Sequence, residues 1–208
     1  MNTIHIPTGQ VMLPGELILP PLAKGVVLFA HGSGSSRFSP RNTFVAQVFQ
    51  QHGIGTLLFD LLTPDEDENY ETRFDIALLA LRLLDATSWL QKHPDTQAKH
   101  LGYFGASTGA AAAIRAAAKA GNKISAVVSR GGRPDLAGQD ALSRLNTPTL
   151  LIVGANDFGV MELNQEAYAL INCEKSFIRI PGATHLFEEP GKLEQAATHA
   201  TDWFRRYL

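Results

Sequence analysis

Cysteine is nearly absent from this chain, which has a single one, Cys173, among 208 residues. One cysteine excludes a disulfide within the chain and a cluster of thiolate metal ligands, and it is typical of a reducing compartment. We therefore expect a cytoplasmic protein in which Cys173 fills space and takes no part in chemistry.

An excess of charge of one sign is also lacking. The chain has 18 Lys and Arg residues against 20 Asp and Glu residues, a formal net charge of −2, so nothing in its composition attracts nucleic acid or an anionic membrane. No lysine or arginine precedes Lys24 and no long apolar run occurs there, which predicts neither a signal peptide nor a membrane anchor. We expect a small-molecule substrate as the partner; the composition leaves the oligomeric state open.

Short apolar runs rich in β-branched residues recur along the chain. They cover residues 25–30, 54–60, 100–105, 124–129, 149–154 and 176–180. Most lack polar alternation, which is typical of strands covered on both faces. Between them, apolar residues recur at three- and four-residue steps over residues 76–90 and 193–207, the pattern of helices packed on a sheet.

This alternation of strands and helices predicts a three-layer α/β fold with a mostly parallel sheet. The length fits one domain covering residues 1–208. The runs at residues 3–7 and 10–20 have no crossover helix between them, so we expect an antiparallel hairpin at the sheet edge. The charged stretch DEDENYE, residues 65–71, is interpreted as a solvated loop.

A serine stands between two glycines where a strand is predicted to meet an alanine-rich helix. Gly105-Ala106-Ser107-Thr108-Gly109 satisfies the pattern G-x-S-x-G, in which a sharp strand-to-helix turn lifts the serine hydroxyl clear of the sheet. Small neighbours and a strained backbone are expected at such a turn. The alternative is that Ser107 only caps the helix.

An oxyanion that forms beside this serine needs N–H donors. The start of the helix supplies the Thr108 N–H. The glycine-rich loop HGSGSS, residues 31–36, follows the first parallel strand, and we predict the Ser33 N–H as the second donor.

A serine nucleophile also needs a base, and the base needs an acid to orient it. In the predicted fold they follow in the order serine, acid, histidine. Asp157 follows the strand at 149–154 and His185 follows the last strand, whereas the other six histidines lie elsewhere. We predict Ser107, Asp157 and His185 as the catalytic residues, with Asp135 as the alternative acid.

The segments HGSGSS, GASTGA, GAND and PGATHLFEEPG resemble, in this order, those of the α/β-hydrolases, and more narrowly the small lidless members grouped with dienelactone hydrolase. The resemblance covers nearly the whole chain. It implies an eight-stranded, mostly parallel sheet with Ser107 as nucleophile, Asp157 as acid and His185 as base. Dienelactone hydrolase itself has a cysteine where this chain has Ser107, at the strand-to-helix turn called the nucleophile elbow. It also has a glutamate in the oxyanion loop, the loop that corresponds to residues 31–36, so its lactone substrate is not implied.

These features predict a serine hydrolase that cleaves an ester-type bond of a small substrate, whether carboxylester, lactone or thioester, without a metal or organic cofactor. An acyltransferase, a peptidase and a non-catalytic binding protein of the same fold are the alternatives. Only 19 residues, RGGRPDLAGQDALSRLNTP, separate two of the predicted strands where relatives insert a cap domain. We therefore expect no lid.

Three arginines are predicted at the mouth of the site. Arg37 lies in the oxyanion loop, and Arg130 and Arg133 stand at the end of the strand that follows the elbow helix. Guanidinium groups there could bind a carboxylate or phosphate of the substrate. The alternative is that the acidic stretch 65–71 neutralises them.

Overall fold

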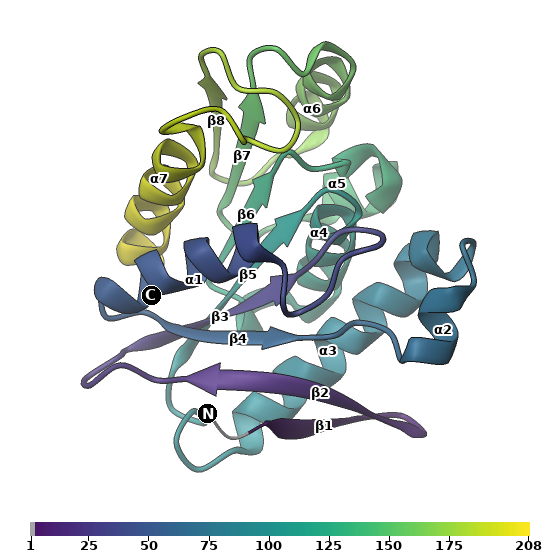
Figure 1. The fold of residues 1–208 in the computed structure, drawn as a ribbon, viewed down its shortest axis with the longest axis vertical. Helices are drawn as coiled ribbons and strands as arrows, with labels where there is room; N and C mark the ends of the chain where they lie inside the picture. Colours follow the sequence, from purple (N-terminus) through teal and green to yellow (C-terminus); the bar gives the residue numbers. More distant parts are fainter. Residues whose placement is uncertain (1–2) are drawn as a thin grey trace.

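Residues 3–208, the part of the chain that the computed structural model describes, form one eight-stranded sheet flanked by helices (Figure 1). Residues 1–2 of the predicted domain lie outside the described residues. The strands are β1 (Ile4–Thr8), β2 (Val11–Ile18), β3 (Gly25–Ala30), β4 (Gly55–Phe59), β5 (His100–Ala106), β6 (Ala126–Arg130), β7 (Thr149–Gly154) and β8 (Lys175–Ile180). The α-helices are α1 (Pro40–Gln51), α2 (Pro64–Glu68), α3 (Ile76–Lys92), α4 (Thr108–Ala120), α5 (Gln139–Arg144), α6 (Phe158–Leu170) and α7 (Lys192–Tyr207).

The sheet has the order β1-β2-β4-β3-β5-β6-β7-β8. Strands β1 and β2 form the predicted antiparallel hairpin, β2 runs antiparallel to β4, and all pairs from β4 to β8 are parallel. The predicted fold class is confirmed. β3 lies between β4 and β5 in the sheet, so the β3–β4 connection runs over one face of the sheet and the β4–β5 connection over the other. The two connections diverge at the carboxyl ends of the strands and leave a crevice there.

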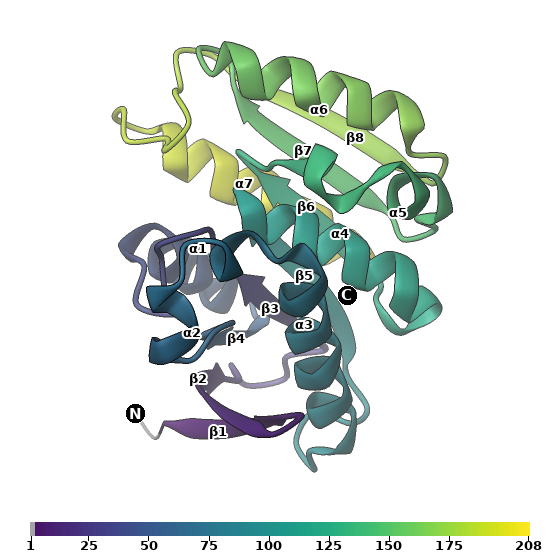
Figure 2. The ribbon, with the colours of Figure 1, turned by 90° about the vertical axis from the view of Figure 1, so that its right-hand side faces the viewer.

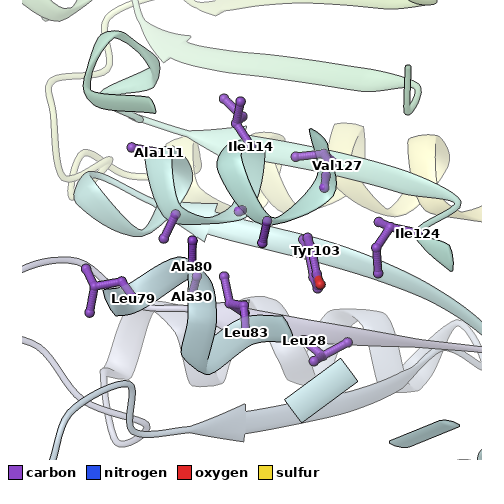
Figure 3. Packing of buried hydrophobic residues seen from close by; sticks show 14 of the residues in the cluster. Leu28, Ala30, Leu79, Ala80, Leu83, Tyr103, Ala111, Ile114, Ile124 and Val127 are labelled. Atoms are coloured by element: carbon purple, nitrogen blue, oxygen red, sulfur yellow. The ribbon is translucent and has the colours of Figure 1, made fainter. Parts of the chain in front are cut away.

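Helices cover both faces of the sheet, with α1 and α7 on one side and α3, α4, α5 and α6 on the other (Figures 1 and 2). Beneath α1 and α7, the rings of Phe29, Phe49 and Phe104 lie with centroids 5.0–5.7 Å apart. On the other face, side chains of α3 and α4 meet those of β3 and β5 in a second buried cluster (Figure 3). There the Tyr103 hydroxyl lies 2.6 Å from the Thr87 hydroxyl, so this buried polar group is satisfied.

The acidic stretch after β4 is not simply a solvated loop, which corrects the sequence-based interpretation. Thr63 and Glu66 form a capping box at the start of α2, with the Glu66 N–H 3.2 Å from Thr63 Oγ1 and the Thr63 N–H 2.9 Å from Glu66 Oε2. The motif T-P-D-E is the signal for this cap. Glu66 also lies 2.7 Å from the buried Arg82 of α3, and Asp67 pairs with Arg73.

The connection between β6 and β7 is short, as predicted. It holds a 3-10 helix, Pro134–Ala137, and the six-residue helix α5, both of which contact α4. No cap domain occurs in this connection. Within residues 3–208 no helix has the length and apolar character needed to cross a membrane.

Candidate active site

Ser107 lies at the turn from β5 into α4 with φ 51° and ψ −122°. A positive φ is rare for a residue with a side chain and stores strain, so the predicted sharp turn is present. The Ser107 side chain makes no cap hydrogen bond to α4, which removes the alternative of a simple helix cap. Its carbonyl accepts N–H groups from Ala110 at 3.1 Å and Arg133 at 3.0 Å, and these bonds hold the turn.

The glycines beside the serine are explained by backbone that passes close to them. A Cβ on Gly109 would lie 2.1 Å from the carbonyl oxygen of Ala30 in β3, and a Cβ on Gly105 would lie 2.4 Å from Cα of Ala110. Either contact is far inside van der Waals distance. The glycines therefore let α4 start directly against β3 and β5, which places Ser107 beside the loop that follows β3.

A cavity of about 270 Å³ opens over the serine. It is lined by Gly32, Ser33, Ser35, Ser39, Arg41, Asn42, Ala106, Ser107, Arg130, Gly131, His185 and Leu186. Its walls come from the loop after β3, the first turn of α1, the end of β6 and the loop after β8. The cavity thus brings together segments far apart in the sequence.

His185 and Asp157 meet at the side of this cavity, with His185 Nδ1 2.7 Å from Asp157 Oδ2. This bond leaves Nε2 as the ring nitrogen free to exchange a proton. Asp135, the alternative acid, is bound instead to Arg133 by two hydrogen bonds of 2.9 and 2.7 Å. Within residues 3–208 no hydrogen bond joins Ser107 Oγ to His185.

The loop that carries His185 is held by a carboxylate. Glu189 accepts the Thr184 hydroxyl at 2.6 Å and the Thr184 N–H at 3.1 Å. The hydroxyl contact lowers the pKa of Glu189. This pair fixes the residue directly before the histidine.

The predicted oxyanion donors lie side by side, but one of them is engaged. The Ser33 N–H donates to Thr108 Oγ1 at 2.9 Å, so it must exchange this bond to serve as an oxyanion donor, and the role of Ser33 stays a prediction. The Thr108 N–H lies in the first turn of α4, where N–H groups have no partner within the helix. Gly32 packs against the serine, since a Cβ there would lie 3.1 Å from Ser107 Cβ.

His31 anchors the same loop, a role that the sequence did not indicate. Its Nε2 accepts the Leu61 N–H at 3.0 Å, and its Nδ1 lies 3.1 Å from the Gly32 carbonyl. The ring therefore carries its proton on Nδ1. Burial lowers the pKa of His31, so the ring is neutral in the folded protein.

The structure places the three predicted arginines in different surroundings. The Arg37 side chain pairs with Asp60, whose carboxylate also accepts the Arg37 N–H at 2.7 Å, and Arg133 pairs with Asp135. Neither lines the cavity over Ser107, so no contact with that cavity supports the prediction that Arg37 and Arg133 bind the substrate. None of the three pairs with residues 65–71 within the described chain, which corrects the alternative. Arg130 does line the cavity.

Two cavity residues escaped the sequence analysis. Arg41 and Asn42 stand in the first turn of α1, and Arg41 Nη1 lies 3.0 Å from Glu188 Oε1. The pair Ser39-Pro40 is a helix-start signal. Because α1 follows β3, this signal could have located the first turn of α1 at the mouth of the site.

An eight-stranded, mostly parallel sheet with a strained serine after β5 and an acid–histidine pair after β7 and β8 defines the architecture of an α/β-hydrolase. The chain belongs to the dienelactone hydrolase family, whose model matches residues 42–208. Membership of this family supports hydrolase activity.

The chain is also similar to individual known proteins. A dienelactone hydrolase from Anabaena variabilis is 53% identical, with a TM-score of 0.97 over 100% of this chain and 97% of that one. Est1E from Butyrivibrio proteoclasticus shares the fold, with a TM-score of 0.83 at 16% identity over 99% of this chain and 98% of that one. A Mycobacterium tuberculosis protein with the provisional name of a phosphoribosyl transferase is 56% identical over 205 residues, which cover 99% of this chain and 46% of that protein. The chain therefore spans about half the length of the curated relatives it matches.

Proposed function

We propose that this protein hydrolyses an ester-type bond of a small substrate through an acyl-enzyme on Ser107. The observation that carries the proposal is the strained, uncapped Ser107 beneath a cavity shared with His185, whose Nδ1 is held 2.7 Å from Asp157. A serine hydroxyl becomes a nucleophile only when a base takes its proton. His185 is the base in the cavity, and Asp157 fixes the tautomer that leaves Nε2 free to act.

The reaction follows from these positions. Ser107 Oγ attacks the carbonyl carbon, His185 Nε2 takes the hydroxyl proton, and the carbonyl oxygen becomes an oxyanion. The imidazolium then gives the proton to the leaving alcohol or thiol as the bond to it breaks, and the serine ester remains. Water repeats the sequence, with His185 again acting first as base and then as acid.

The Thr108 N–H and the Ser33 N–H are the proposed donors to the oxyanion. For Ser33 this requires an exchange, because its N–H is bound to Thr108 Oγ1 at 2.9 Å. The oxyanion is a stronger acceptor than a hydroxyl. The exchange therefore becomes favourable only as negative charge develops on the carbonyl oxygen, which is the differential binding that catalysis needs.

Water is the proposed acceptor because, within residues 3–208, the β6–β7 connection forms no cap over the cavity. The short β6–β7 connection packs against α4, whereas transfer to another acceptor requires that water be kept out. The transferase name of the mycobacterial relative belongs to a protein of which this chain spans 46%.

The test is covalent labelling with a fluorophosphonate, together with hydrolysis of p-nitrophenyl acetate. The wild type should be labelled and active, while Ser107→Ala should be unlabelled, with kcat lower by roughly 10³ or more. Ser143→Ala, an exposed serine on α5, is the matched control and should behave as the wild type. Labelling or turnover retained in Ser107→Ala would overturn the proposal.

A further inference from the structure

A second cavity, of about 230 Å³, adjoins the loop over residues 31–36. Its walls come from β2, from the loop after β3, and from the segment that leads from the end of β4 into α2. Ser35 lines both this second cavity and the cavity over Ser107. The two cavities are therefore neighbours, and they meet at Ser35.

The ionisable groups in the wall of the second cavity are already bound within the chain. Arg37 and Asp60 form an ion pair, and Asp67 pairs with Arg73. Both ring nitrogens of His31 are bound to backbone groups. A charged ligand group placed there would lose its hydration without gaining an unpaired partner, which costs free energy.

The rest of the wall is apolar or consists of hydroxyl groups. Ser36 Oγ accepts the Phe38 N–H at 3.3 Å, and Thr63 Oγ1 accepts the Glu66 N–H at 3.2 Å. Only the Ser35 hydroxyl, where the two cavities meet, makes no hydrogen bond within residues 3–208. The remaining wall residues are apolar: Pro14, Leu62 and Pro64. The second cavity thus favours an apolar occupant.

Exposed aromatic side chains lie in the segments next to this cavity. Phe38 is 70% exposed, and Tyr70 and Phe74, which follow α2, are 69% and 39% exposed. The two segments lie against each other, since a Cβ on Gly34 would lie 3.7 Å from Arg73 Nη1. Exposed aromatic side chains on adjoining segments are typical of a surface that binds apolar groups.

We propose that the second cavity binds an apolar arm of the substrate, so that the site selects esters with an alkyl chain over esters of short acids and alcohols. This inference rests on the proposed ester hydrolysis at Ser107. The scissile carbonyl lies over Ser107, and the arm passes Ser35 into the second cavity. Each methylene group that moves from water into an apolar cavity favours binding by about 4-fold.

The selectivity experiment compares three neutral esters. Methyl hexanoate carries the arm on the acyl side, hexyl acetate carries it on the alcohol side, and methyl acetate has no arm. The wild type should favour at least one longer ester over methyl acetate in kcat/KM by about 10- to 100-fold, measured as acid release at constant pH. The favoured ester identifies the side that carries the arm. Methyl acetate cleaved as efficiently as both longer esters would overturn the inference.

Two variants fill the second cavity from different walls. Ser36→Phe adds a ring from the loop after β3, and Pro64→Trp adds one from the first turn of α2; both residues line the second cavity and neither lines the cavity over Ser107. Each variant should remove most of the preference for the longer ester. Ser143→Phe, the same substitution at an exposed serine of α5, is the control and should keep the preference. If both filling variants also keep it, the arm does not lie in the second cavity and the inference is wrong.

A binding experiment separates this subsite from the chemistry. The three esters are titrated calorimetrically into Ser107→Ala, where at least one longer ester should bind about 10-fold or more tightly than methyl acetate. The difference should disappear in Ser107→Ala/Ser36→Phe. That result supports the subsite even if the wild type hydrolyses no ester, in which case the proposed hydrolysis fails alone. Equal binding of all three esters to Ser107→Ala would show that the subsite is wrong, whether or not esters are cleaved.

Discussion

Arg82 and Arg130 are equally buried, 7% and 6% exposed, yet their surroundings differ. Arg82 joins three elements at the N-terminal corner of the sheet: it lies 2.7 Å from Glu66 of α2, and its Nη1 donates to the carbonyl and hydroxyl oxygens of Thr8 in β1, each at 2.7 Å. Arg130 has one long bond to Asn42. The corner thus holds an arginine paired with a carboxylate, whereas the mouth of the cavity holds a buried arginine that has no carboxylate partner within residues 3–208; such departures from local rules are expected near functional sites.

The largest expected effect is a loss of activity, without a loss of stability, at the mouth of the cavity. Asp157→Asn should lower kcat/KM for p-nitrophenyl acetate by about 10² to 10⁴, because an amide favours the wrong histidine tautomer. The melting temperature should change little. Asp135→Asn, which disturbs only the pair with Arg133, is the control and should stay within a few-fold of the wild type. The reverse ranking would make Asp135 the acid.

The second prediction compares how the loss of Arg82 and the loss of Arg130 change the free energy of unfolding. Arg82→Met leaves Glu66 and Thr8 without their donor and should lower the free energy of unfolding by about 2 kcal/mol in urea titrations. Activity per folded molecule should be unchanged. Arg130→Met removes a charge without a carboxylate partner and should change the free energy of unfolding by less than about 1 kcal/mol. An equal loss in both variants would break the comparison.

A smaller effect is expected from pH, through His31. Burial lowers the pKa of His31 in the folded protein below its ordinary 6.5, so the unfolded chain binds the proton more readily. The stability from neutral His31 is therefore present above about pH 6.5 and is lost as the pH falls toward the folded-state pKa. Urea titrations from pH 8 to pH 5 should show this loss.

His31→Gln is the matched variant for that prediction. The glutamine amide oxygen can accept the Leu61 N–H that His31 Nε2 accepts but does not titrate. Its free energy of unfolding should fall less between pH 8 and pH 5 than that of the wild type. Identical pH dependence in the two proteins would exclude His31 as the cause.

The smallest effect is expected at Cys173, remote from both regions. Its thiol donates to the Thr147 carbonyl at 3.0 Å, and burial raises the pKa of the thiol, so the thiol stays protonated and unreactive. Cys173→Ser can keep that hydrogen bond and should retain esterase activity within about two-fold. Iodoacetamide that inactivates the wild type but spares Cys173→Ser would contradict this.

The sheet and the elbow could be predicted because their signals are local. Uninterrupted apolar runs marked β3 and β7 with the observed bounds, and G-x-S-x-G between a strand and a helix marked Ser107. The order of the strands then brought Asp157 and His185 to the same edge. Each step needed only residues adjacent in the sequence and the chirality of parallel connections.

The charge partners could not be predicted because they depend on tertiary contacts. Arg37 pairs with Asp60, which lies 23 residues further along the chain, directly after β4. The numbers of charged residues in a sequence do not reveal such a pair. The engagement of the Ser33 N–H by Thr108 likewise joins residues 75 apart. The helix α2 is different, because its capping motif, Thr63-Pro64-Asp65-Glu66, is a local signal from which the helix start could be predicted.

The strained turn at Ser107 also affects how the protein loses activity at elevated temperature. Its N–H lies 3.4 Å from the Arg130 carbonyl, and its own carbonyl accepts the Arg133 N–H, so the end of β6 keeps Ser107 in a conformation that costs about 1–3 kcal/mol. Fraying of that one strand end lets the serine relax while the rest of the sheet stays paired. Catalytic half-life at elevated temperature should therefore report on the last residues of β6 before circular dichroism detects any loss of structure.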